Sequence, residues 1–407
     1  MSAPVSSDPA TGAVENRRSI GWRISLHYAA LFLVPGVYLP FFAAWLESRG
    51  LRPTEISIML AVGILMRLVA GPAAAHAVDR SGRRKLAILL LVWVSIASFA
   101  LLGWVEGFSV MLLVWVVHSA AWAPITPFSD NIALLAAARH QLNYGRMRLW
   151  GSVSFLLAAY LSGLWLKGRD EDWIFILLLA GYAVLVGGAH LLPDLRLPLA
   201  RPRAGAPAVM LLRQRRFLLF VGATACLQAS HAAFYTFGTL HWRSMGHSDA
   251  AIGWLWAEGV LAEIVLFAFA QQLPARLGGA GLLLIAAAGG VLRWSITAGA
   301  EEYMLLVLLQ FLHAATFGAA HLGAMRLLTE GCSPETSATA QSLYVAANST
   351  MLALATLAVG PIFAAGGGAI YWAMTVLSLG GGVCAFMLWR RRDGLKFSGD
   401  AATEPGR

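Results

Sequence analysis

The sequence predicts an all-α membrane protein with twelve transmembrane helices, arranged as two six-helix bundles related by pseudo-twofold symmetry. Two observations predict this fold class. Hydrophobic residues make up 58% of the 407 residues and charged residues only 13%, whereas roughly 25% of the residues in an ordinary soluble domain are charged. The chain also contains apolar runs of about 18 residues or more, the length that a helix needs to cross a bilayer.

The apolar runs form two sets of six. The predicted spans of the first set are residues 24–46, 56–78, 86–104, 108–136, 150–167 and 172–192. The spans of the second set are residues 217–240, 250–272, 279–299, 302–326, 337–363 and 367–390. Two sets of equal size suggest repeats related by an axis along the membrane normal, with a substrate held between them near the midplane.

Three polar segments frame the two predicted bundles, which extend over residues 24–192 and 217–390. Residues 1–23 lack the apolar stretch of a cleavable signal peptide and are expected to form a disordered N-terminal tail. Residues 193–216 are rich in Pro and Arg and predict the linker between the bundles. Residues 391–407 are expected to form the C-terminal tail.

Basic residues gather in the segments on one side of the predicted bundles. The tails, the linker and the loops at residues 79–85 and 139–148 hold most of the Lys and Arg residues. Because basic loops stay in the cytoplasm, we expect both termini there, in a bacterial inner membrane. The same orientation accounts for the net charge of +9, so we expect no nucleic-acid partner. The expected state of the protein is a monomer in the lipid bilayer.

The sequence indicates neither a cofactor nor an enzyme. Cys226, Cys332 and Cys384 show no paired spacing, which argues against disulfides and against a metal site. The chain has no HExxH or GxSxG motif and no phosphate-binding loop, so hydrolysis and direct use of ATP are not expected.

Ionisable residues inside the predicted spans are the first candidates for function. Arg67, Asp130, Glu258, Glu263 and Arg293 occupy such positions. An ionisable group at membrane depth is unfavourable unless it is paired or hydrated, so we expect these residues around a polar site.

A motif at the end of the second predicted span carries charges of both signs. Its residues Asp79-Arg80-x-Gly82-Arg83 resemble the loop signature of the major facilitator superfamily. An acid near a helix end, a glycine turn and a basic cluster can form a latch that breaks when the conformation changes. Anchoring of basic residues on the cytoplasmic side is an equally good explanation.

Two longer motifs, GVYLPFFAAWL at residues 36–46 and YGRMRLWGSVSF at residues 144–155, are similar to a branch of that superfamily. They resemble the phenylpropionate permease group and, more distantly, the lactose permease branch. In the sugar permeases an acid eighteen residues before the second arginine of the latter motif holds substrate together with that arginine. The matching residues are Asp130 and Arg148, and a purely structural ion pair is the alternative role.

Local geometry supports a site around these two residues. Arg146 and Arg148 lie about 200° apart around a helix, so only one can face a cavity, and we assign Arg148. Pro124 and Pro127 interrupt the span just before Asp130. Such breaks are tolerated where the freed carbonyl groups line a wet cavity.

Arg293 and His313 lie twenty residues apart, as do an arginine and a histidine of the proton-coupling group in the sugar permeases. The resemblance therefore implies a proton-coupling role for both. The sugar permeases have a Glu three residues after that histidine and a Lys three residues before it, where this chain has Thr316 and Gln310. This departure points to a different proton carrier.

Glu258 and Glu263 are the substitutes that the sequence offers. Their spacing places the side chains about 140° apart on a helix, so we do not expect a shared role. We assign Glu263, nearer mid-depth, as the proton carrier. Glu258 matches a substrate-binding Glu of the sugar permeases and is assigned as a substrate contact. A hydrogen bond to a neighbouring helix is the alternative for either residue.

Arg67, His231 and Trp122 complete the predicted substrate site. A fixed positive charge such as Arg67 suits an anionic substrate better than a neutral sugar. His231 lies in a Ser-His-Ala motif that resembles the family, and Trp122 could stack on an aromatic substrate. Packing within the bundle is the alternative for the last two.

The sequence thus predicts a secondary active transporter that moves a small aromatic or other organic acid together with protons, by alternating access. A sugar or nucleoside symporter is the nearest alternative, and a non-transporting membrane sensor is a more distant one. The expected partners are the small-molecule substrate, protons and lipid.

Overall fold

A computed structural model gives the structure of residues 17–195, 207–273, 275–390 and 397. All regular secondary structure within these residues is helical. The part before the linker forms seven helices: α1 (Arg17–Ser48), α2 (Pro53–Ser81), α3 (Arg84–Leu102), α4 (Phe108–Trp122), α5 (Ile125–His140), α6 (Tyr144–Leu166) and α7 (Asp172–Leu191).

The part from the linker onward is built in the same way. Short 3-10 turns lie at Ala270–Gln272, Ala275–Leu277 and Gly367–Ala369, and a π-helical turn, η3 (Ala314–Ala319), joins two helices. The helices are α8 (Pro207–Leu212), α9 (Arg215–Ala229), α10 (Ala232–Ser244), α11 (Asp249–Ala268), α12 (Gly278–Thr297), α13 (Tyr303–His313), α14 (Ala320–Gly331), α15 (Pro334–Gly366) and α16 (Ile370–Trp389).

Eleven of the described segments are long and apolar enough to cross a membrane. The last segment, residues 335–389, contains two helices, α15 and α16, which are separated by a turn at Gly367 with a φ of 50°. Glycine adopts this backbone conformation without the steric cost that a Cβ would bring. The described chain therefore contains twelve spanning segments, and the predicted fold class is confirmed.

Three of the spans are interrupted near their middle. α4 and α5 are separated at Pro124, as the sequence predicts from a residue that lacks a backbone donor. α9 and α10 are separated at Ser230 and His231, where neither Pro nor Gly gives a signal. The third interruption is the π-helical turn η3, a feature that is frequent at functional sites.

Two helices begin earlier than the sequence predicts. α1 begins at Arg17, so residues 17–23 are helical and the predicted N-terminal tail is too long. Tertiary contact stabilises this helical segment, because Arg23 donates a hydrogen bond of 2.6 Å to a carbonyl oxygen at the end of α7. α6 begins at Tyr144 because the Asn143 side chain caps the helix.

The predicted tails and linker are described only in part. Residues 1–16, 196–206, 391–396 and 398–407 lie outside the described residues. The linker contains the short helix α8, and Phe397 of the C-terminal segment packs against Phe217 and Phe220 of α9.

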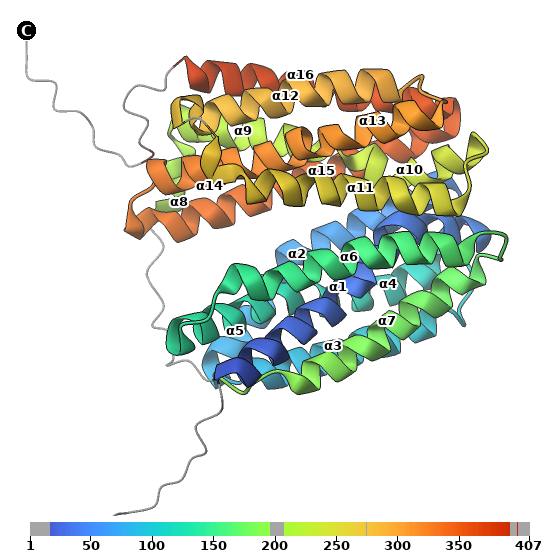
Figure 1. The fold of residues 1–407 in the computed structure, drawn as a ribbon, viewed down its shortest axis with the longest axis horizontal. Helices are drawn as coiled ribbons and strands as arrows, with labels where there is room; N and C mark the ends of the chain where they lie inside the picture. The colour runs from blue at the N-terminus through green and yellow to red at the C-terminus, as the bar shows by residue number, and fades with distance from the viewer. Residues whose placement is uncertain (1–16, 196–206, 274, 391–396, 398–407) are drawn as a thin grey trace, which may run out of the picture.

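The helices pack as two groups, α1–α7 (the N bundle) and α8–α16 (the C bundle), as Figure 1 shows. The bundles meet closely at one end, where Gly163 on α6 faces Gly253 on α11. A Cβ atom on Gly253 would lie 2.5 Å from the carbonyl oxygen of Ala159, so a larger residue would separate the helices. Arg243 and Glu171 form an ion pair of 3.1 Å across the same end. Towards the end where α1 begins and α16 ends, the bundles diverge (Figure 1).

Candidate functional site

A cavity of about 220 Å³, termed the central cavity, lies between the two bundles. Helices α1 and α6 line it from the N bundle, and α10, α11, α13 and η3 line it from the C bundle. Its ionisable lining residues are Arg148, Glu263, His313 and Tyr235, and most of the other lining side chains are aromatic or aliphatic. The cavity therefore offers a few charged groups within apolar walls, as small-molecule sites do.

Glu263 and His313 face each other at the wall of the central cavity. The Glu263 Oε2 atom lies 3.9 Å from the His313 Nε2 atom, which is longer than a hydrogen bond. The Glu263 side chain is 21% exposed and the His313 side chain 8% exposed. The carboxyl group is therefore the member of the pair that the cavity reaches more easily.

Arg293 is buried next to His313 and does not line the central cavity. Its Nη1 atom donates to the His313 Nδ1 atom and to the Thr316 hydroxyl, both at 3.0 Å, and its Nη2 atom donates to the Gln310 Oε1 atom at 2.8 Å. A guanidinium can only donate, so the Nδ1 atom accepts. A neutral His313 ring then carries its proton on Nε2, the atom nearest to Glu263.

No carboxylate forms an ion pair with Arg293 among the described residues. Instead, its guanidinium carbon lies 5.0 Å from the Phe234 ring centroid and 4.5 Å from the Trp294 ring centroid. Neutral acceptors and aromatic faces thus stabilise the buried charge. The neutral acceptors include Thr316 and Gln310, the two residues at which the sequence departs from the sugar permeases.

His231 lies at the far end of the same network. Its Nε2 atom is 3.1 Å from the Thr316 hydroxyl oxygen, and its Nδ1 atom is 3.1 Å from the carbonyl oxygen of Leu227. The side chain is buried and does not line the central cavity, in contrast to the substrate position that the sequence predicts. The reason is the break between α9 and α10, which places His231 at the start of α10.

Asp130 and Arg148 do not form the direct ion pair that is the alternative to their predicted substrate role. Asp130 accepts hydrogen bonds from the Tyr28 hydroxyl at 2.5 Å and from the Tyr144 hydroxyl at 3.2 Å. The Arg148 guanidinium carbon lies 3.9 Å from the Phe32 ring centroid and 5.5 Å from the Tyr28 ring centroid. Tyr28 therefore lies between the two charges, and only Arg148 lines the central cavity.

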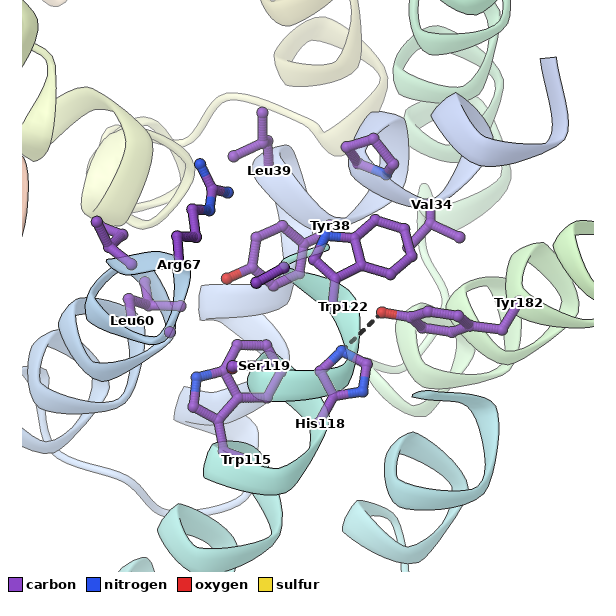
Figure 2. Close-up of a pocket in the computed structure, with 14 residues that line it drawn as sticks. Val34, Tyr38, Leu39, Leu60, Arg67, Trp115, His118, Ser119, Trp122 and Tyr182 are labelled. Atoms are coloured by element: carbon purple, nitrogen blue, oxygen red, sulfur yellow. Dashed lines mark hydrogen bonds between the residues drawn. The ribbon is translucent and has the colours of Figure 1, made fainter. Parts of the chain in front are cut away.

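A second cavity, of about 110 Å³, lies within the N bundle and is termed the N-bundle cavity. Figure 2 shows Tyr38, Trp115, Trp122, His118 and Tyr182 around it. The rings of Tyr38 and Trp115 are stacked, with centroids 5.9 Å apart and an angle of 11° between their planes. Trp122 also lines this cavity, and its contact with a substrate stays a prediction.

Hydrogen bonds fix the aromatic wall of the N-bundle cavity. The Tyr182 hydroxyl lies 2.8 Å from the His118 Nε2 atom, which the dashed line in Figure 2 marks. The His118 Nδ1 atom lies 3.1 Å from the Ser95 carbonyl oxygen, and Trp115 donates to the Met59 carbonyl oxygen at 2.7 Å. These rings are held in place by contacts that do not involve a ligand.

Among the described residues, Arg67 is the only Lys, Arg, Asp or Glu that lines the N-bundle cavity. Its side chain extends towards Leu39 (Figure 2), and Leu39 lines both cavities. Among the described residues, the guanidinium has no hydrogen-bond or ion-pair partner. A guanidinium can pair with a carboxylate through two parallel hydrogen bonds.

Glu258 lines neither cavity. It is 3% exposed, and its Oε2 atom has no hydrogen-bond partner among the described residues. The turn of α11 directs Glu258 about 140° away from Glu263, which lines the central cavity. A substrate contact through Glu258 stays a prediction.

The predicted latch is described only at its turn. Gly82 ends α2 with a φ of 66° and donates its N–H to the Val78 carbonyl oxygen at 2.8 Å, and Arg83 precedes α3. The side chains of Asp79 and Arg80 lie outside the described part of the chain.

Sequence reasoning missed several aromatic residues of the two cavities. Tyr38 and Phe32 come from α1, Tyr182 comes from α7, and Phe234 and Trp256 come from α10 and α11. Tyr38 lies within the family-like motif at residues 36–46, so the sequence could have indicated it as a site residue. The others follow from how helices meet in space, which no spacing along the chain reports.

Comparisons with known proteins agree with this architecture. Residues 21–374 match the family described as the MFS_1 like family. The chain is 31% identical over 373 residues to the probable 3-phenylpropionic acid transporter of Escherichia coli strain K12, and 89% of this chain and 96% of that relative are covered. The maltose permease of Geobacillus stearothermophilus is 26% identical over 330 residues, with 79% and 82% covered.

A solved structure has the same fold. A mutant of the nucleoside transporter NupG superposes with a TM-score of 0.79 at 16% identity, covering 91% of this chain and 99% of that chain. The family match extends over both bundles. This chain therefore belongs to the MFS_1 like family of major facilitator transporters, and it is a multi-pass membrane protein and a secondary transporter.

Proposed function

We propose that this transporter carries a small aromatic acid of the phenylpropionate type together with protons, by alternating access, across a bacterial inner membrane. It works as a monomer with both termini in the cytoplasm. The observation that carries the substrate class is Arg67, a guanidinium without a described partner beside a wall of fixed aromatic rings. The name of the 31% identical relative, a probable 3-phenylpropionic acid transporter, supports the same class.

Each part of such a substrate has a matching group. Its carboxylate binds Arg67 or, from the central cavity, Arg148, because guanidinium and carboxylate groups pair with two parallel hydrogen bonds. Its ring stacks on Trp122 or Tyr38 in the N-bundle cavity. Leu39 lines both cavities, so the two possible binding places are adjacent.

Coupling to protons rests on Glu263, His313 and Arg293. Glu263 takes up a proton from the central cavity. The His313 ring, which accepts a hydrogen bond from Arg293 and faces Glu263, couples the buried Arg293 charge to the carboxyl group electrostatically. A bound proton neutralises Glu263, and a bound carboxylate neutralises Arg148 or Arg67. Closing the bundles over neutral groups costs less than closing them over charges, so the loaded carrier changes conformation more readily.

The remaining predicted residues take supporting roles in this proposal. Asp130 positions Tyr28, whose ring lies beside Arg148. His231 holds Thr316 against Arg293. The segment from Asp79 to Arg83 acts as the latch at the cytoplasmic end.

A sugar or nucleoside is the second candidate substrate. The maltose permease and NupG are relatives or structural neighbours, and aromatic faces also stack on sugar rings and bases. A neutral substrate does not explain the presence of Arg67, because it has no group that requires a fixed positive charge.

Uptake into proteoliposomes tests the proposal. With a proton gradient imposed, wild-type protein is expected to accumulate radiolabelled 3-phenylpropionate, and unlabelled 3-phenylpropionate should compete far better than 3-phenylpropanol, which lacks the carboxylate. Arg67→Gln should remove most of that preference. Arg326→Gln is the matched control, because Arg326 pairs with Glu330 near the end of α14 and lines neither cavity. Competition by sugars or nucleosides instead of aromatic acids would establish the second candidate.

A further inference from the structure

A third hollow lies outside both cavities, at the end of the N bundle where the chain begins. It has a volume of about 320 Å³ and is formed by the first turns of α1 and α6 and by the segment between α5 and α6. Three of its lining side chains are basic, and none of the described residues that line it is Asp or Glu. It is termed the arginine groove for Arg17, Arg18 and Arg146.

One helix has its N-terminal end at this groove. α6 begins at Tyr144, next to the lining residues Asn143 and Arg146. The N–H groups of its first turn and the helix dipole make this end attractive to an anion. Arg17 donates to the Gln141 carbonyl oxygen, while the Arg146 guanidinium has no hydrogen bond or ion pair with the described residues. Neither Arg17 nor Arg146 therefore has a carboxylate partner among the described residues.

A pair of tryptophans forms one side of the arginine groove. The ring centroids of Trp22 and Trp150 lie 5.7 Å apart with 47° between the ring planes. Trp22 is 57% exposed and Trp150 is 44% exposed. Exposed Trp near the ends of spanning helices is typical of the boundary between hydrocarbon and headgroups.

The face of α6 that carries Arg146 points to lipid. Arg146, Trp150, Leu157 and Leu161 lie within about 40° of Trp150 around the helix axis, and the two leucines are exposed. Arg148 lies on the opposite side of the helix and lines the central cavity. The two arginines of the motif at residues 144–155 therefore face different surroundings. Arg148 lines the central cavity, and Arg146 lines the arginine groove instead.

We propose that the arginine groove binds the phosphate headgroup of an anionic phospholipid from the leaflet at this end of the bundle. Arg146 and Arg17 pair with the phosphate oxygens, and the Trp22 and Trp150 rings lie against the glycerol and the first part of an acyl chain. Free phosphate shares the headgroup chemistry, but the exposed tryptophan pair and the leucines of α6 fit a molecule with an acyl chain. The bound lipid ties α1 to α6, two helices that line the central cavity.

Thermal unfolding of the full-length protein in detergent tests this site without any transported substrate. The additives are phosphatidylglycerol, phosphatidylcholine with the same acyl chains, and inorganic phosphate. A ligand that binds the folded protein raises the midpoint temperature of unfolding. We expect phosphatidylglycerol to raise this temperature clearly more than the other two additives do.

Paired variants locate the effect. The double variant Arg17→Gln and Arg146→Gln should lose most of the additional shift that phosphatidylglycerol gives. Arg169→Gln should keep it, because Arg169 also lies near two tryptophans, at 4.3 Å from Trp165, but at the opposite end of α6. If the double variant does not fold, Arg146→Gln and Arg146→Lys are compared in its place, and only the lysine variant should keep part of the shift.

Two outcomes would overturn the proposal. An undiminished shift by phosphatidylglycerol in the groove variants would place the lipid elsewhere. An equal shift by inorganic phosphate in the wild-type protein would make a free anion the ligand instead of a lipid.

Discussion

The His313 Nε2 atom lies 3.9 Å from the Glu263 Oε2 atom, while the Nδ1 atom of the same ring accepts a hydrogen bond from Arg293 at 3.0 Å. The ring thus connects a permanently charged, buried guanidinium to a carboxyl group at the wall of the central cavity. A change of charge on the carboxyl group alters the environment of the whole network. The expected consequence is that transport depends on the protonation of Glu263.

Glu263→Gln should separate substrate movement from proton movement. Glutamine keeps the size of the side chain but cannot take up or release a proton. We expect exchange of labelled for unlabelled substrate to continue, and accumulation driven by a proton gradient to be lost. Both are measured in proteoliposomes. Glu258→Gln is the control on the same helix and should retain accumulation, and normal accumulation by Glu263→Gln would exclude Glu263 as the carrier.

The Asp130, Tyr28 and Arg148 group should respond in a graded manner. Arg148→Ala removes the cavity charge itself, and the loss of one charged hydrogen bond costs about 1.5–3 kcal/mol, or roughly 10- to 100-fold in binding. Asp130→Asn should reduce uptake less, because the asparagine oxygen still accepts from Tyr28. Initial uptake rates, corrected for the amount of protein in the membrane, give the comparison. A larger loss for Asp130→Asn than for Arg148→Ala would mean that the Asp130 charge acts directly on the substrate.

The glycine contact between the bundles should control closure of one end. Gly163→Leu is expected to separate α6 from α11, because a Cβ there would already overlap the backbone of α11 at Asp249 and Gly253. The reporter is Ser57→Cys in a variant without the native cysteines, since Ser57 is buried where α2 meets α15. A shift of about 1.4 kcal/mol towards the open state changes its ratio to the closed state tenfold. The rate of thiol labelling should rise about as much.

The control for this experiment is Gly187→Leu. No atom lies within 4 Å of a Cβ built on Gly187, so that variant should leave the labelling rate unchanged. Equal labelling in the Gly163→Leu variant and the parent would show that the glycine contact does not hold this end closed.

Features that lie along one helix or between successive helices could be predicted from the sequence. The twelve spans follow from hydrophobicity, and the break at Pro124 follows from its missing donor. Arg293 and His313 lie on α12 and α13, which follow each other along the chain, so their spacing carried the information that brings them together. The fold was predictable for the same reason, because bilayer thickness sets the length of each span.

Features that join distant helices could not be predicted in this way. Tyr28 lies 102 residues before Asp130, and no spacing rule shows that its hydroxyl replaces Arg148 as the partner of that acid. The N-bundle cavity combines Tyr38, Trp115 and Tyr182 from three helices. His231 does not line the central cavity. It lies at the break between α9 and α10, which contains neither proline nor glycine, so the sequence did not indicate the direction of its side chain.

Thr316 offers a test of whether the coupling network can accept its proton carrier at another position. Its hydroxyl lies 3.0 Å from Arg293 Nη1 and 3.1 Å from the His231 ring, at the position where the sugar permeases that this sequence resembles carry a Glu. Thr316→Glu in the Glu263→Gln background returns one carboxyl group to the network. The larger side chain costs about 1–3 kcal/mol in packing, and pairing with Arg293, which has no described carboxylate partner, offsets part of that cost. We expect accumulation driven by the proton gradient to return in part.

Thr316→Gln in the same background is the control. Glutamine has the same size as glutamate without the titratable group, so this double variant should remain uncoupled. Restored accumulation in both double variants would attribute the recovery to packing and would contradict a proton-carrying role for this network, and accumulation in neither would restrict that role to the position of Glu263 at the cavity wall.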